Sequence, residues 1–130
     1  AHKVLQSATS LTVIGLGVCD QVQVGPDGHH FSIGFSASEI LCGRLLDAWL
    51  RSHPGDKFSM CDPLAVAVAA DPSIVELRTA EMHVTTDGSE RGRSIAKFGE
   101  GNLKVAVAVD TPKALSMIHT LAFKRHLLAP

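Results

Sequence analysis

The sequence predicts an α/β fold with one antiparallel addition, and three observations support this. Residues 11–18 are rich in β-branched side chains and punctuated by glycine, as in a buried strand of a parallel sheet. Residues 62–70 form an almost entirely apolar segment of helical length. Two strand-like stretches within residues 78–98 meet at Asp87-Gly88, which is a hairpin signal. Strands that alternate with helices, together with a hairpin, indicate a layered mixed fold.

The size and charge of the chain limit the classes of function and partner that it can have. The chain has 130 residues, 45% of them apolar, which predicts one domain or one large part of a domain over residues 1–130. The formal net charge of -1 offers no basic surface for nucleic acid. No apolar run is long enough for a membrane span, and residues 1–6 lack a signal-peptide core. We therefore expect neither nucleic acid nor a membrane as partner. Because the chain begins at Ala1 instead of methionine, we also expect that it derives from a longer parent.

The first quarter of the chain predicts a helix, a strand and a loop. Residues 1–9 have the pattern of the end of a helix, and the strand at 11–18 follows. Gly25-Pro26-Asp27-Gly28 is a strong turn cluster, which predicts loop over residues 19–35.

A longer helix comes next. Ser36 and Glu39 match a capping box, and the apolar-rich segment behind them runs through Leu50 until His53-Pro54-Gly55 ends it. One face of this helix would carry five apolar side chains: Ile40, Leu41, Leu45, Ala48 and Trp49.

Residues 62–70 predict a short helix that is buried on all sides, because nearly every position is apolar. Asp71-Pro72 should end it.

The last third predicts a hairpin, a strand and a helix. Residues 78–86 and 89–98 would form the two strands of the hairpin. Residues 104–109 predict a strand, because valine and alanine alternate after Lys104. Asp110-Thr111-Pro112 should then cap a final helix that reaches about Arg125.

The cysteines indicate a reducing compartment. Cys19, Cys42 and Cys61 are odd in number, widely spaced and without a C-x-x-C pair, so a disulfide framework or a zinc knuckle is not indicated. We expect a cytoplasmic protein in which Cys19 and Cys42 are packed, reduced thiols.

The junction Cys61-Asp62-Pro63 carries the strongest chemical signal. Asp62 is expected at a helix N-cap with Pro63 at the first helical position, and its carboxylate is also a candidate ligand for a metal or a hydroxyl group. The two roles are compatible, since one oxygen can cap while the other binds. Cys61 is either a packed small residue or a polar, nucleophilic group at a pocket mouth. No catalytic-cysteine signature surrounds it.

The other candidate residues have ordinary structural explanations. The pair His29-His30 lies in the predicted loop, and His83, His119 and His126 have no spacing partner for a metal site. Arg91-Gly92-Arg93 is expected to be a solvated edge. The sequence contains no G-x-G-x-x-G, P-loop or serine-elbow motif.

Several stretches together carry a resemblance. The segment Cys61-Asp62-Pro63-Leu64-Ala65-Val66-Ala67 resembles the His-Asp-Pro-x-Ala-Val-Ala motif of the inosine–uridine-type nucleoside hydrolases, and Cys19-Asp20-Gln21 stands where that family often has Thr-His-Gln. Four further segments resemble family segments in the same order: residues 1–5, 11–16, 91–93 and 102–106. The resemblance implies the C-terminal part of a nucleoside-hydrolase fold, with a mostly parallel sheet and an antiparallel hairpin addition.

The resemblance also implies a function. Members of the family hydrolyse the N-glycosidic bond of ribonucleosides, purine or pyrimidine, to ribose and free base, with a calcium ion that binds the ribose diol and activates a water. By resemblance, Asp62 is a calcium ligand near the sugar hydroxyls, and Cys61 replaces the histidine that many members use as proton donor to the leaving base. Calcium favours carboxylate oxygens, which fits Asp62.

One part of the family pattern is absent from this sequence. The N-terminal cluster Asp-x-Asp-x-x-x-Asp-Asp, which supplies most calcium ligands and the base, does not occur here. We therefore expect the N-terminal portion of the same enzyme or another chain as a partner, and a homo-oligomer. The alternative is a non-catalytic remnant that acts as a binding or oligomerisation module. A third possibility is a thiol enzyme that uses Cys61.

Overall fold

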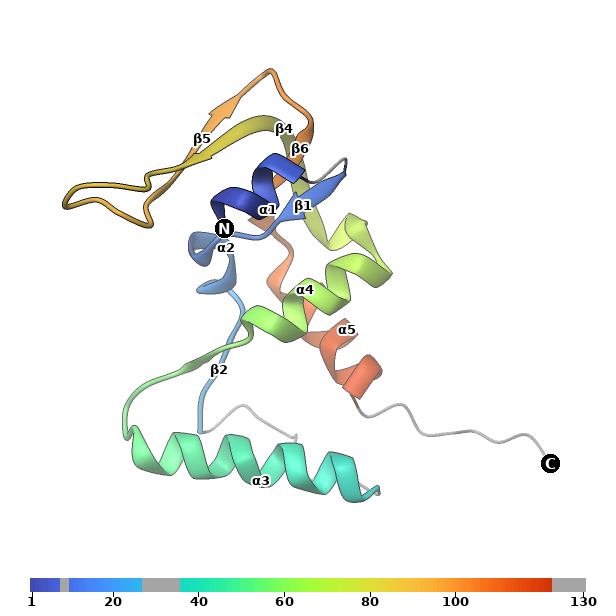
Figure 1. Cartoon of the computed structure of the whole chain (residues 1–130). Helices are drawn as coiled ribbons and strands as arrows, with labels where there is room; N and C mark the ends of the chain where they lie inside the picture. Colours follow the sequence, from blue (N-terminus) through green and yellow to red (C-terminus); the bar gives the residue numbers. More distant parts are fainter. Residues whose placement is uncertain (8–9, 27–35, 123–130) are drawn as a thin grey trace.

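The computed structural model describes residues 1–7, 10–26 and 36–122 and has an α/β architecture (Figure 1). A four-stranded sheet has the strand order β1-β6-β4-β5, and a separate two-stranded ribbon joins β2 to β3. The predicted fold class is thus confirmed. The elements in chain order are α1 (His2–Ser7), β1 (Leu11–Val13), α2 (Leu16–Cys19), β2 (Gln23–Val24), α3 (Ala37–Ser52), β3 (Phe58–Ser59), α4 (Cys61–Ala70), the 3-10 helix η1 (Pro72–Ile74), β4 (Val75–Val84), β5 (Ser94–Phe98), β6 (Leu103–Val109) and α5 (Thr111–Ala122).

The parallel part of the sheet is the pair β1 and β6, in register from Leu11 with Leu103 to Val13 with Val105. The strand predicted over residues 11–18 is therefore too long. The carbonyl oxygen of Gly15 accepts the N–H groups of Val18 and Cys19 at 3.0 and 3.1 Å, which turns the chain into α2. These local hydrogen bonds take the place of a strand ladder beyond Ile14.

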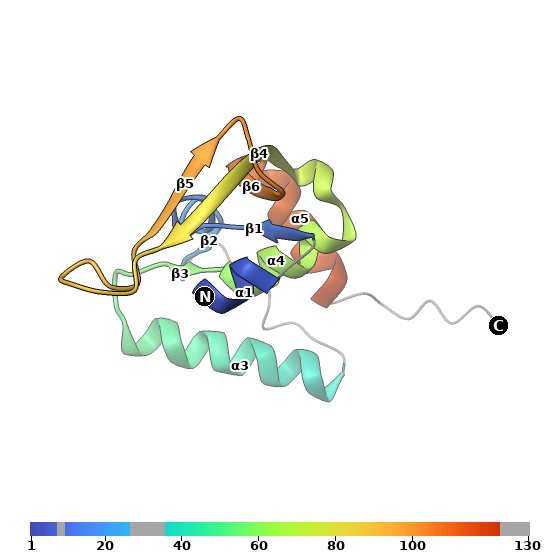
Figure 2. The ribbon, with the colours of Figure 1, turned by 45° about the horizontal axis from the view of Figure 1, so that its top comes forward.

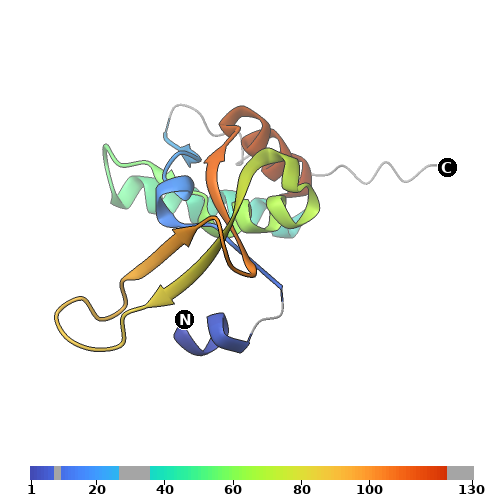
Figure 3. The ribbon, with the colours of Figure 1, turned by 90° about the horizontal axis from the view of Figure 1, so that it is seen from above.

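The antiparallel hairpin is confirmed as β4 and β5, and it extends away from α4 and α5 (Figure 3). Its connection spans residues 85–93, longer than a two-residue turn at Asp87-Gly88, and the Thr85 N–H still bonds the Arg93 carbonyl oxygen at 2.9 Å. Strand β4 is also antiparallel to β6, so it lies between its two partners.

Helix α4 lies across the centre of the molecule and is not buried on all sides as predicted. Leu64, Ala67 and Val68 are buried, whereas Val66 is 61% exposed. Its other sides border two hollows, which are described below. It ends as predicted at Asp71, whose carboxylate accepts the Ser73 N–H at 3.0 Å and so begins η1.

Helix α3 begins with the predicted capping box. The Glu39 N–H donates to Ser36 Oγ at 3.2 Å, and the Ser36 N–H donates to Glu39 Oε2 at 2.8 Å. The predicted apolar face remains largely uncovered: Leu41 is 57% exposed and Leu45 is 61% exposed. Figures 1 and 2 show why, since α3 lies apart from the sheet and from the other helices.

The core lies between α4, α5 and one face of the sheet. Its buried members are Val18, Cys19, Val22, Val24, Met60, Leu64, Ala67, Val68, Ile74, Val75, Ala106, Ala114 and Ile118. Helix α5 is capped by Asp110 as predicted, because Asp110 Oδ1 accepts the Lys113 N–H at 3.0 Å. Its predicted extension to Arg125 falls outside the described residues. Among the described helices, none has the length and apolar character that a membrane crossing requires.

Candidate functional site

The candidate site is a hollow of about 480 Å³ on one side of α4, here called the Cys61 hollow. Residues of α4 line it at helical spacing, from Cys61 and Asp62 through Ala65 to Ala69, so they share one face of the helix. The opposite wall comes from β1, α2, η1 and β4. The complete lining is Thr12, Ile14, Cys19, Cys61, Asp62, Ala65, Val68, Ala69, Pro72 and Leu77.

Asp62 lies in the first turn of α4 and not at the N-cap, so that prediction was wrong. The Met60 carbonyl oxygen accepts the Leu64 N–H at 2.8 Å, which makes Met60 the N-cap residue. The Met60 N–H also donates to the Val22 carbonyl oxygen at 2.9 Å, and this bond fixes where the extended chain ends. Pro63 remains acceptable, because N–H groups in the first helical turn have no partner within the helix.

The Asp62 carboxylate is exposed and makes no capping bond at this helix end. A negative charge in the first turn is favoured by the helix dipole. The side chain is therefore available to a ligand in the Cys61 hollow.

Two thiols meet in this hollow. Cys61 is half-buried and packs against the core cluster, which includes Cys19. Burial above all, together with the neighbouring Cys61 thiol and the charge of Asp20, raises the pKa of the Cys19 thiol to about 11. Cys19 is only 4% exposed, so it is the packed thiol that the sequence predicts. Cys42 contradicts the same prediction, because it is exposed on the detached helix α3.

A polar chain beside the hollow was not anticipated from the sequence. Gln23 Nε2 donates to Ser59 Oγ at 3.0 Å, and Ser59 Oγ donates to Asp20 Oδ1 at 2.9 Å. These bonds tie α2 to the ribbon of β2 and β3. Ser59 lies far from Asp20 in the sequence, and no spacing signal connects them.

The described residues do not make a calcium site by themselves. Calcium takes six to eight oxygen ligands. Asp62 is the one carboxylate that lines the Cys61 hollow, and among residues 1–7, 10–26 and 36–122 no three His, Cys, Asp or Glu side chains group to hold a metal. The role of Asp62 as a calcium ligand therefore stays a prediction.

The histidines do not gather at the hollow. His83 on β4 lies against His2 of α1, with ring centroids 5.9 Å apart, and His119 lies on α5. The pair His29-His30 and His126 fall outside the described residues. The predicted solvated edge is confirmed, since Arg91 and Arg93 are exposed on the connection between β4 and β5.

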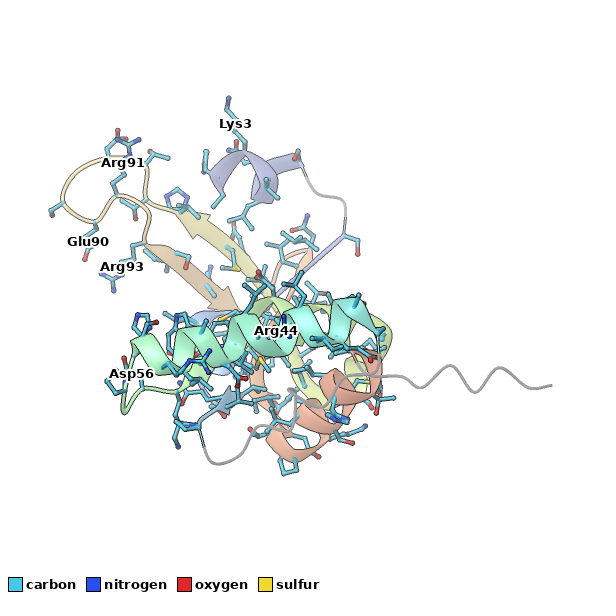
Figure 4. All side chains as sticks on the ribbon, turned by 90° about the horizontal axis from the view of Figure 1, so that it is seen from below. Lys3, Arg44, Asp56, Glu90, Arg91 and Arg93 are labelled. Atoms are coloured by element: carbon cyan, nitrogen blue, oxygen red, sulfur yellow. The ribbon has the colours of Figure 1, made fainter. Side chains whose placement is uncertain are left out.

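Figure 4 shows these arginines with Glu90, which forms an ion pair with Arg93.

A second hollow lies on the other side of α4. This apolar cleft has a volume of about 590 Å³ and is lined by apolar side chains and a thiol, from α3, β3, α4 and α5. Trp49 stands at its α3 wall, edge-on to Phe58 with ring centroids 5.1 Å apart. The lining residues are Cys42, Leu45, Leu46, Trp49, Phe58, Met60, Pro63, Val66, Ile118, Leu121 and Ala122. Such a lining suits the burial of apolar surface and offers no acid or base for chemistry.

Comparisons with known proteins agree with this fold. The family model described as inosine-uridine preferring nucleoside hydrolase matches residues 1–116. A plant nucleoside hydrolase structure is similar with a TM-score of 0.77 and 19% identity, over 95% of this chain and 44% of that one. A purine-preferring ribonucleoside hydrolase from Gardnerella vaginalis is similar with a TM-score of 0.75 and 28% identity, over 94% of this chain and 42% of that one. A search of curated proteins gave no match.

Proposed function

This chain belongs to the inosine-uridine preferring nucleoside hydrolase family, and we propose that it is the C-terminal part of an enzyme that hydrolyses ribonucleosides to ribose and free base. The observation that carries the proposal is the family match over residues 1–116, which includes the whole of the Cys61 hollow. The two similar hydrolase structures support the same fold.

The chain spans less than half the length of either of these structures. We therefore propose that the remaining ligands and the base come from an N-terminal portion, in the same gene product or in another chain. The single carboxylate in the Cys61 hollow supports this, because one ligand cannot satisfy a calcium ion.

Asp62 is proposed as one calcium ligand, close to the sugar hydroxyls. Its support is an exposed carboxylate at the start of a ten-residue helix, open to the hollow and without a capping role. When bound, the calcium ion would supply a water of lowered pKa for attack on the sugar carbon. The contribution of this chain is to hold the Asp62 carboxylate in place through the bond that fixes Met60.

Cys61 is proposed to face the leaving base and to donate its proton to it. Its support is its position beside Asp62, at the point where the hollow meets α4. A neutral thiol is a weaker acid than an imidazolium near neutral pH. The thiol should therefore give less help to a poor leaving group than a histidine in this position.

The test is an assay of the protein as it occurs naturally, with inosine and uridine, with and without calcium. We expect Asp62→Ala to lower kcat/KM by about a hundredfold or more, with the stability changed by no more than about 1 kcal/mol. Asp87→Ala, on the connection between β4 and β5, is the matched control and should leave activity unchanged. Undiminished activity in Asp62→Ala would overturn the assignment of Asp62.

Two observations favour a second candidate, a non-catalytic module that binds or oligomerises. They are the lone carboxylate in the Cys61 hollow and the open apolar cleft. Turnover by the natural protein separates the two candidates. Hydrolysis of inosine or uridine that disappears in Asp62→Ala would exclude the non-catalytic module, whereas binding of calcium and ribose without hydrolysis would support it.

We also propose a cytoplasmic role in nucleoside salvage, acting on nucleosides and not on nucleic acid. The three free cysteines support a reducing compartment.

A further inference from the structure

The thiols of Cys19 and Cys61 come from distant parts of the sequence into one hollow. Cys19 is the last residue of α2 and Cys61 is the first residue of α4. The two helices pack directly against each other, with Cα atoms within 8 Å. Both side chains line the Cys61 hollow.

Two hydrogen bonds join residues that lie close to the two cysteines in the sequence. The Met60 N–H donates to the Val22 carbonyl oxygen at 2.9 Å, and Ser59 Oγ donates to Asp20 Oδ1 at 2.9 Å. The segments that carry Cys19 and Cys61 are thus joined by one backbone hydrogen bond and one side-chain hydrogen bond.

The two thiols differ in access. Cys61 is half-buried and reaches the hollow, whereas Cys19 lies behind it at 4% exposure and carries its proton at neutral pH. An oxidant in the hollow therefore meets Cys61 first, with Cys19 in place as the second thiol. Cys42 lines the apolar cleft on the other side of α4 and takes no part.

We propose that Cys19 and Cys61 are a peroxide-sensitive thiol pair that closes to a disulfide and reopens with a thiol reductant. The Cys61 thiolate attacks one peroxide oxygen, the O–O bond breaks, and the leaving hydroxide takes up a proton to become water. Cys61 is then a sulfenic acid. The Cys19 sulfur attacks the Cys61 sulfur, the S–S bond forms, and the hydroxyl group leaves with the Cys19 proton as a second water. Two thiols are oxidised by two electrons, and one peroxide is reduced to two waters.

If the proposed function holds, the disulfide would also control hydrolysis. It removes the Cys61 proton from the hollow, so oxidation would stop proton donation to the leaving base and reduction would restore it. The existence of the pair itself is independent of hydrolase activity.

The experiment uses the natural protein with Cys42→Ser, which removes the third thiol of residues 1–130. We expect hydrogen peroxide to lower the intact mass by two hydrogens, peptide mapping to link Cys19 to Cys61, and iodoacetamide labelling of Cys61 to fall by about tenfold or more. Dithiothreitol should restore mass and labelling. Oxidation of Cys61 to a sulfinic acid with no link to Cys19 would overturn the proposal, and so would an unchanged mass.

Two variants give the control. Cys19→Ser, or Cys19→Ala if the serine destabilises the core, should leave a Cys61 sulfenic acid that dimedone traps. In the parent with both thiols, dimedone should trap little, because Cys19 resolves the sulfenic acid first. Equal trapping in both proteins would contradict the role of Cys19. All these readouts are masses, so an inactive enzyme that forms the link would refute the proposed function and leave the thiol pair intact.

Discussion

Gly101 is the residue whose lack of a side chain matters most to the sheet. Strand β4 pairs with β6 up to Ala80 and with β5 from Ala80 onward, so the connection from β5 to β6 must cross β4 at this point. Gly101 lies in that connection at φ +121°, and a Cβ there would fall on the carbonyl group of Ala80. Only glycine permits so close a crossing.

We therefore expect Gly101→Ala to destabilise the fold by about 3 kcal/mol or more. Gly99→Ala is the matched control, because Gly99 also has a positive φ, +107°, but has open space around its Cβ position. It should cost only about 1–2 kcal/mol. Urea unfolding of both variants measures the difference, and equal losses would contradict the crossing as the cause.

The ionisation of Asp71 should make the stability of the fold depend on pH, in a direction that follows from its lowered pKa. The hydroxyl and N–H groups of Ser73 lower the pKa of Asp71 below its ordinary value of 3.8, and Lys113, at 3.4 Å, adds to the effect. Because the pKa is lower in the folded state, the ionised Asp71 carboxylate stabilises the fold at pH values above its unfolded-state pKa. This stabilisation is lost as the pH falls through the folded-state pKa.

Asp71→Asn should therefore lower Tm at neutral pH, and the difference from the parent should shrink as the pH falls below about 3.8. Thermal unfolding followed by circular dichroism across this range tests it. Asp56→Asn, at an exposed carboxylate outside the helices, should show no such trend. A gap that widens in acid would contradict the assigned sign.

Among the elements, α3 depends most on its own sequence. It lies apart from the sheet, and its anchors are near its C-terminal end, where Trp49 contacts Phe58 and stacks on His53 with centroids 4.3 Å apart. In its N-terminal half Leu41 is 57% exposed, and the capping box supplies hydrogen bonds to the first turn.

Ser36→Ala should remove about 1 kcal/mol of helix stability, and the effect should be confined to the first turns of α3. Amide hydrogen exchange should show faster exchange at residues 38–41 and unchanged exchange in β4 and β6. Ser38→Ala is the control, since Ser38 contacts the Ser36 hydroxyl but does not cap the helix. Equal exchange in the two variants would show that the capping box is not the stabiliser.

At the scale of the whole molecule, the open apolar cleft is the main departure from a closed core. Leu45 and Val66 are each 61% exposed and face it from α3 and α4. Apolar surface of this kind is normally covered by protein. The remaining part of a nucleoside hydrolase, or a second copy of this chain, is its proposed cover.

We expect the 130-residue chain to self-associate, and Leu45→Glu with Val66→Glu to shift it toward monomer in sedimentation velocity runs. Both positions are exposed, so the double variant should keep its circular dichroism spectrum. Ile95→Glu, at an exposed apolar position on the outer strand β5, is the control. A monomeric parent would refute the expectation, and dissociation by Ile95→Glu alone would assign the association to the sheet edge instead.

Local signals in the sequence determined much of the fold. The capping box at Ser36, the end of α4 at Asp71, the hairpin and the cap at Asp110 were all predictable, because each depends on hydrogen bonds or backbone preferences within a few residues. The motif that begins at Cys61 also pointed to the family that the comparisons support.

The tertiary structure decided what depends on distant contacts. The start of α4 at Cys61 follows from a bond between Met60 and Val22, and no local pattern carries that information. The apolar residues of α3 and α4 look like core residues in the sequence. The positions of whole elements leave one face of α3 exposed and leave α4 with a hollow on each of two sides. The presence of Cys19 and Cys61 in one hollow is of the same kind, because it follows from the packing of α2 against α4.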